Sequence, residues 1–126
     1  MLNFNSIMLG TDNLKEMVEF YNKVLGKPTM EDGGYTGWLV GSGWFSIGEH
    51  SEVGGKSKEP ARCMWFFETA DVKGEFERIQ EIGAEVIREP YKPSPGDDMM
   101  LATLADPDGN YFQLASPWED GDTKDK

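Results

Sequence analysis

The chain has 126 residues, 38% of them apolar and 12% aromatic, so it is long enough for one ordinary domain and too apolar for a disordered protein. Its 23 acidic and 12 basic side chains give a formal net charge of −11, which disfavours binding to the phosphate backbone of nucleic acids. No apolar run reaches the roughly 18 residues needed to cross a membrane, and the first residues lack a signal-peptide pattern. We therefore expect a cytoplasmic protein that binds neither nucleic acid nor membrane.

The first half of the chain predicts a strand, a helix and three more strands. Residues 4–9 form a short apolar run typical of a strand. Asn13 then stands where a helix N-cap belongs, with Glu16 completing a capping-box pattern, and Gly26 stands where the helix should end. Three further strands, separated by glycine-rich turns, are expected at residues 28–31, 35–40 and 44–49.

The second half predicts the same order of elements after a linker at residues 51–61, which lacks hydrophobic periodicity. Its helix is capped by Asp71 and ends at Gly83. A loop held extended by three prolines and the turn at residues 106–110 separate the later strands. The strands of this half are expected at residues 62–69, 85–88, 99–105 and 111–115.

These two halves repeat one another at an offset of 58 residues, since Thr11-Asp12-Asn13-Leu14 aligns with Thr69-Ala70-Asp71-Val72. The repeat predicts an α+β fold of two βαβββ modules, at residues 4–50 and 61–118, within one domain of residues 1–118. We expect both helices on one side of a curved eight-stranded mixed sheet, whose concave face holds a ligand cavity. Residues 119–126 read as an acidic flexible tail.

Two motifs connect the chain with a known family. The first helix ends in Phe20-Tyr21-Asn22-Lys23-Val24-Leu25-Gly26, and the turn Asp106-Pro107-Asp108-Gly109-Asn110 leads into Tyr111-Phe112-Gln113-Leu114. With these motifs the chain resembles the vicinal oxygen chelate superfamily, which includes glyoxalase I, extradiol dioxygenases, fosfomycin-modifying enzymes and bleomycin-resistance proteins. The resemblance extends over nearly the whole chain, and it implies that two chains pair as a homodimer.

The resemblance also implies four metal-ligand positions, on the first and fourth strands of each module. Carried over to this sequence, they fall on residues without an imidazole, carboxylate or thiolate: Ser6, Ser46, Met64 and Gln113. The 58-residue repeat pairs Ser6 with Met64 independently of the resemblance. A neutral set with one amide oxygen does not offset the dehydration of a divalent ion, so we expect no metal and no other cofactor.

The alternation of side chains along strands extends these positions into a pocket lining rich in methionine and aromatic residues, which suits a flat or greasy organic molecule. An ordinary core closing the cavity is the alternative. Glu68 is read either as a solvated strand end or as a counter-charge or general base, and His50 lies at the rim. The predicted ligand-binding residues are Ser6, Met8, Ser46, Met64, Phe66, Glu68, Leu101, Thr103, Tyr111 and Gln113.

Three functions remain open from the sequence. The favoured one is a metal-free protein that sequesters or carries an aromatic, possibly cationic, compound, in the manner of bleomycin-resistance proteins. The net charge of −11 and Glu68 favour the positive group on that ligand. The alternatives are a metal-dependent enzyme like a glyoxalase or dioxygenase, and a regulatory module without a ligand.

Overall fold

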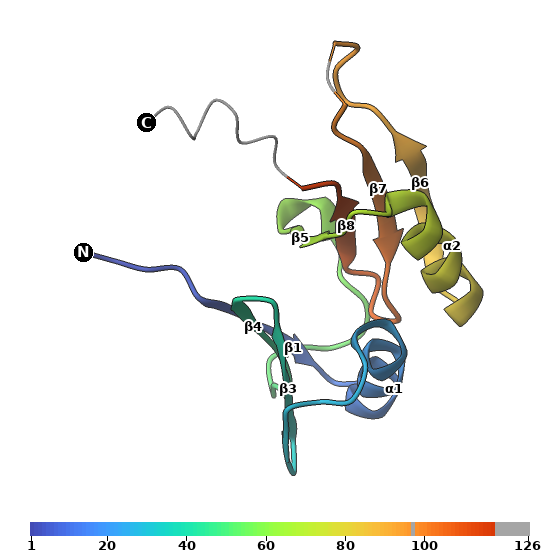
Figure 1. The fold of residues 1–126 in the computed structure, drawn as a ribbon. Helices are drawn as coiled ribbons and strands as arrows, with labels where there is room; N and C mark the ends of the chain where they lie inside the picture. The colour runs from blue at the N-terminus through green and yellow to red at the C-terminus, as the bar shows by residue number, and fades with distance from the viewer. Residues whose placement is uncertain (97, 118–126) are drawn as a thin grey trace. The chain divides into compact units, whose positions relative to one another are not determined.

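The computed structural model describes residues 1–96 and 98–117. The chain divides into two compact units, Met1–Ser57 and Lys58–Lys126, and the boundary lies inside the predicted linker. Among the described residues, each unit contains one α-helix and one four-stranded mixed sheet (Figure 1). The predicted tail at residues 119–126 lies outside the described residues, and the single domain of residues 1–118 stays a prediction.

Module one contains strands β1 (Ser6–Thr11), β2 (Met30–Asp32), β3 (Tyr35–Val40) and β4 (Gly43–Glu49), and helix α1 (Leu14–Leu25) between β1 and β2. The strand order across the sheet is β1-β4-β3-β2, with β1 and β4 parallel and the other neighbours antiparallel. The parallel pair joins the first and last strands of the module, which puts Met8 beside Ser46.

Module two repeats this plan with β5 (Trp65–Glu68), α2 (Val72–Ile82), β6 (Glu85–Tyr91), β7 (Leu101–Ala105) and β8 (Tyr111–Ala115). Its strand order, β5-β8-β7-β6, corresponds strand for strand to that of module one. The predicted α+β class with two βαβββ modules is therefore confirmed, and the eight strands are hydrogen-bonded as two sheets of four. None of the described helices is both long and apolar enough to span a membrane.

Several strand ends differ from the prediction. Strand β1 begins at Ser6 and β7 at Leu101, each two residues later than expected. Strand β5 begins only at Trp65, because the chain before it turns through a short 3-10 helix, Pro60–Arg62, with proline at its first position. Strand β6 instead continues through Pro90 to Tyr91, which a strand at the edge of a sheet tolerates.

The repeat extends to individual hydrogen bonds before the two helices. The Thr11 hydroxyl oxygen accepts from the Asn13 backbone N–H at 2.8 Å, and the Thr69 hydroxyl oxygen accepts from the Asp71 N–H at 3.1 Å. Asp71 caps α2 as predicted, since its side chain accepts from the Gly74 N–H. The capping box predicted at Asn13 is wrong, because the Asn13 side chain makes no capping hydrogen bond.

The core of module one lies between α1 and one face of its sheet. The Tyr21 ring, fully buried, lies 4.8 Å from the Phe45 ring and 6.3 Å from the Trp38 ring. In module two the corresponding contacts join α2 to β6, β7 and β8, over the buried residues Phe112 and Leu104. Each sheet therefore has one face covered by its helix and a second, helix-free face.

The Asp106–Asn110 turn closes the β7–β8 hairpin, as the sequence predicts. Oδ1 of the buried Asp106 accepts from the backbone N–H groups of Asp108 at 2.9 Å and Asn110 at 3.0 Å. Gly109 has φ +80°, which side chains disfavour. The turn sets the hairpin register, in which Ala105 lies opposite Tyr111 and Thr103 opposite Gln113.

Candidate ligand-binding faces

The three predicted site residues of module one share the helix-free face of its sheet. Met8 is the direct partner of Ser46 across the parallel pair, and Ser6 precedes Met8 by two residues. Met8 is 51% exposed and Ser6 is exposed, whereas Ser46 is buried and its hydroxyl donates to the Ile7 carbonyl oxygen at 3.3 Å. Ser46 is thus on the same side of the sheet as Met8, but it is buried there and not open to solvent.

The same face carries an aromatic pair that the sequence prediction did not include. The Trp44 indole lies over the backbone of Gly37, where an added Cβ would be only 2.7 Å from Trp44 Cε2. The indole N–H donates to the Tyr35 hydroxyl at 2.6 Å, which restrains the position of the ring. We call Trp44 and Tyr35 over Gly37 the indole platform. Trp44 precedes Ser46 by two residues, so strand alternation was a signal that could have identified it.

Most predicted residues of module two form cross-strand neighbours on its helix-free face. Phe66 pairs with Gln113 on β8, and Gln113 pairs with Thr103 on β7. Glu68 and Leu101 both pair with Ala115, so they belong to the next row on the same face. Phe66 is 53% exposed and Glu68 is exposed, whereas Leu101, Thr103 and Gln113 are buried.

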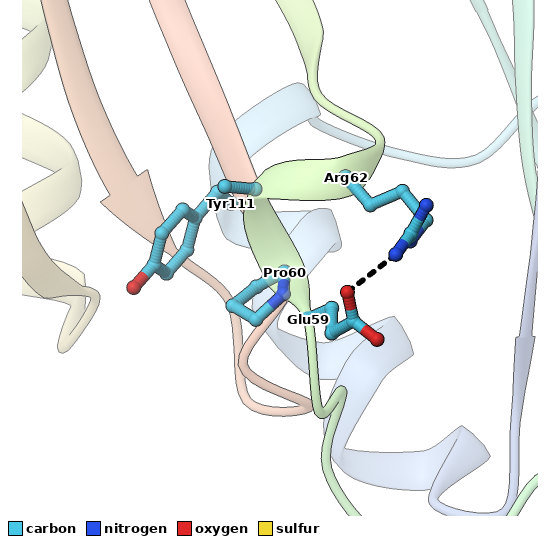
Figure 2. Close-up of a pocket in the computed structure, with 5 residues that line it drawn as sticks. Glu59, Pro60, Arg62 and Tyr111 are labelled. Atoms are coloured by element: carbon cyan, nitrogen blue, oxygen red, sulfur yellow. Dashed lines mark hydrogen bonds and ion pairs between the residues drawn. The ribbon is translucent and has the colours of Figure 1, made fainter.

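Met64 and Tyr111 lie at one end of this face. Met64 directly precedes β5 and is 39% exposed. Tyr111, the first residue of β8, lines an open depression of about 300 Å³ together with Glu59, Pro60, Ala61 and Arg62. Figure 2 shows Pro60 between the Tyr111 ring and the Glu59–Arg62 ion pair, whose charged atoms are 2.5 Å apart. Three of the residues that complete this depression, Glu59, Pro60 and Ala61, belong to the segment predicted as a linker, whereas Arg62 was predicted as the start of a strand.

The residues at the four implied metal positions do not fit a divalent ion. The hydroxyl of Ser46 is engaged with a backbone carbonyl, and Met64 offers only a thioether. Oε1 of Gln113 accepts from the Thr103 hydroxyl at 2.8 Å. Among residues 1–96 and 98–117, no three or more His, Cys, Asp or Glu side chains come close enough together to hold an ion. The donor chemistry of this chain therefore does not support the metal site of the superfamily's enzymes.

His50 lies at the end of β4, next to Gly10 on the neighbouring strand. It is exposed, and its Nδ1 accepts from the Glu52 backbone N–H at 3.2 Å. The position agrees with the strand alternation used to predict it, and the contact gives His50 a local structural role.

Arg88 is a second residue that the sequence prediction did not include. Its guanidinium carbon lies 3.5 Å from the centroid of the Tyr91 ring, which is close enough for a cation–π contact. Arg88 pairs with Thr103 and Tyr91 pairs with Leu101, both members of the helix-free face. The face thus carries a cation in addition to the carboxylate of Glu68.

Comparison with known proteins identifies the family. The family model of the glyoxalase-like domain matches residues 6–115, so the chain belongs to the glyoxalase-like domain family. A search of curated proteins gave no match. The family and the fold agree with the resemblance to the vicinal oxygen chelate superfamily.

Solved structures share the fold at low sequence identity. A glyoxalase-related enzyme from Fulvimarina pelagi is 16% identical, with a TM-score of 0.74 over 93% of this chain and 89% of that chain. A glyoxalase/bleomycin resistance protein from Albidiferax ferrireducens is 19% identical, with a TM-score of 0.74 over 90% and 98%. The fosfomycin resistance protein FosX from Mesorhizobium loti is 17% identical, with a TM-score of 0.71 over 98% of both chains. At these identities the similarity shows the fold alone.

Proposed function

We propose that the protein binds a small aromatic organic molecule without a metal ion, and that it sequesters or carries this compound. The indole platform carries the proposal, because Trp44 is held in one orientation by Gly37 beneath it and Tyr35 beside it. A pre-oriented ring loses little conformational freedom when a flat ligand stacks on it. Met8 adds a polarizable neighbour on the same face, where its sulfur would lie 3.6 Å from a Cβ if Gly48 carried one.

The absence of metal-ligating side chains supports binding over metal-dependent catalysis. The superfamily resemblance implies Ser6, Ser46, Met64 and Gln113 at the metal-ligand positions, and none of them supplies an anionic or imidazole ligand. Solved structures with this fold include proteins named for resistance to bleomycin and to fosfomycin. The function proposed here corresponds to the bleomycin-resistance name. The proposed ligand is therefore a compound that the protein holds intact.

Calorimetric titration with 2-naphthylmethylammonium tests the proposal. We expect binding to persist in the presence of EDTA and to remain unchanged after addition of Zn²⁺, Mn²⁺ or Ni²⁺. The Trp44→Leu variant should bind the probe about tenfold more weakly, because an aromatic pair contributes about 0.5–1.5 kcal/mol beyond the area it buries. Cyclohexylmethylammonium, which has the same charge but no aromatic ring, is the matched control and should be little affected by the substitution. Loss of binding in EDTA, or stoichiometric retention of a metal by the purified protein, would contradict metal independence.

The helix-free face of module two offers a second aromatic surface, Phe66, and the carboxylate of Glu68 on the same face is expected to favour a positive group on a ligand bound there. Glu68 is exposed at the end of β5, on the helix-free face and close to Phe66 in sequence. The Glu68→Gln variant should bind 2-naphthylmethylammonium about two- to fivefold more weakly, the range for one exposed ion pair. Affinity for the neutral naphthalene-2-carboxamide should not change. Glu77→Gln, on the exposed side of α2, alters the net charge equally and should affect neither probe.

The pairing of two chains as a homodimer, implied by the superfamily resemblance, is also proposed. Sedimentation velocity in solution measures it directly. A single species with the mass of one 14.1 kDa chain at all concentrations would exclude a stable dimer.

A further inference from the structure

Among the residues that the structure describes, Arg88 is the one arginine with no carboxylate partner. Arg62 pairs with Glu59 and Arg78 pairs with Glu75. Within the described part of the chain Arg88 makes no ion pair, and its guanidinium lies over the Tyr91 ring. In a protein with a net charge of −11, an arginine that makes no ion pair with the described residues is a candidate for binding an anionic group of a ligand.

An irregularity of β6 turns Arg88 toward the helix-free face. Val86 pairs with Leu104 on the helix-covered face, and in a regular strand Arg88, two residues later, would share that face. A register shift between Val86 and Arg88 places Arg88 opposite Thr103 instead. Bulges of this kind often occur beside functional sites, where they redirect one side chain.

A second register shift brings Tyr91 beneath the guanidinium. Residues three apart in a regular strand point to opposite faces, so Arg88 and Tyr91 would not meet. The shift between them pairs Tyr91 with Leu101, two residues from Thr103, and so places both side chains on one face. Pro90 lies within this irregular stretch, at the edge of the sheet. The contact thus depends on two departures from regular strand geometry.

Arg88 ends a row of side chains that crosses the sheet through Thr103 and Gln113 to Phe66. The Thr103 hydroxyl donates to Oε1 of Gln113, so the oxygen of this side-chain amide already has a hydrogen-bond partner. The amide nitrogen Nε2 then has two N–H donors with no partner among the residues that the structure describes. Gln113 and Arg88 therefore both offer donors, and Phe66, 53% exposed, offers an aromatic surface at the opposite end of the row.

We propose that this row recognises the carboxylate of an aromatic carboxylic acid, with the carboxylate at Arg88 and Gln113 and the ring against Phe66. The inference rests on the proposed binding of an aromatic compound, and it concerns a second charged group of that ligand, a carboxylate, at the sheet edge opposite to Glu68. A guanidinium presents paired N–H donors that match the two oxygens of a carboxylate. Glu68 does not neutralise Arg88, because β5 and β6 are opposite edges of the sheet, separated by three strand spacings or about 14 Å.

Titration with naphthalene-2-carboxylate, naphthalene-2-carboxamide and 2-naphthylmethylammonium tests the inference. Arg88→Gln should weaken binding of the carboxylate about tenfold, as expected for loss of a charge-assisted hydrogen bond. Binding of the carboxamide should fall less, and binding of the ammonium compound should not fall. Arg88→Lys keeps the charge but loses the planar fork, so it should recover only part of the carboxylate affinity.

Arg78→Gln is the matched control, since it removes the same charge from α2, away from the row. If Arg78→Gln weakens carboxylate binding as much as Arg88→Gln does, the effect is general electrostatics and the inference is overturned. Unchanged carboxylate binding in Arg88→Gln overturns it as well, while leaving the proposed aromatic-binding function intact. If none of the three compounds binds the wild-type protein, the proposed function itself fails, and the inference fails with it.

Discussion

Replacing Asp106 by alanine is expected to lower the free energy of unfolding by about 2–4 kcal/mol, since a buried donor left without a partner costs about 1–3 kcal/mol. The side chain is 5% exposed and accepts from two backbone N–H groups, those of Asp108 and Asn110. Its second oxygen accepts from the Asn110 side-chain amide at 3.0 Å. Alanine removes all these side-chain acceptors from the turn. Urea-induced unfolding measures the change.

Asp98→Ala is the control for this substitution. Asp98 is also an aspartate in a loop of module two, but it is almost fully exposed and lies 3.9 Å from Lys92. Its replacement should change the free energy of unfolding by less than about 0.5 kcal/mol. Asp106→Asn keeps Oδ1 as an acceptor and should be less harmful than alanine. Equal stability of Asp106→Ala and Asp98→Ala would show that the turn does not depend on the Asp106 carboxylate.

Replacing Gly37 by alanine is expected to displace Trp44 and to weaken aromatic binding about tenfold. A Cβ at position 37 would overlap the indole, at 2.7 Å from Cε2 and closer still to Cζ2. The ring must then move away from Tyr35 and lose the 2.6 Å hydrogen bond from its N–H group. Overpacking of this kind typically also costs about 1–3 kcal/mol of stability. The indole N–H resonance of Trp44 and titration with 2-naphthylmethylammonium report the two effects separately.

Gly43→Ala provides the matched control on the adjacent strand β4. A Cβ at position 43 would meet only backbone oxygens of Asn5 and Val40, both at 3.8 Å, an ordinary contact distance. This variant should keep the Trp44 resonance and the affinity for the probe. An unshifted Trp44 resonance in Gly37→Ala would mean that the indole does not rest on Gly37, and the indole platform would then lose its structural basis.

The repeated design of the chain could be predicted from residues alone because its signals are local. The cap position of Asp71, the turn glycine Gly109 and the alternation along β4 and β8 each depend on neighbouring residues in sequence. Alternation also placed Phe66, Thr103 and Gln113 on one face, and the register of the sheet agrees. The role of these residues as a binding site stays a prediction.

The sequence by itself thus determined the two modules, their helices and the face that most candidate residues share. Tertiary structure alone decided the place of Arg88, because a register shift against β7 reverses the face that regular alternation would give it, and a second shift brings Tyr91 to the same face. It also decided the orientation of Trp44, which depends on a glycine of the neighbouring strand and on the Tyr35 hydroxyl. Both features arise from contacts between neighbouring strands. The alternation of residues along one strand indicates only which face of the sheet each side chain occupies.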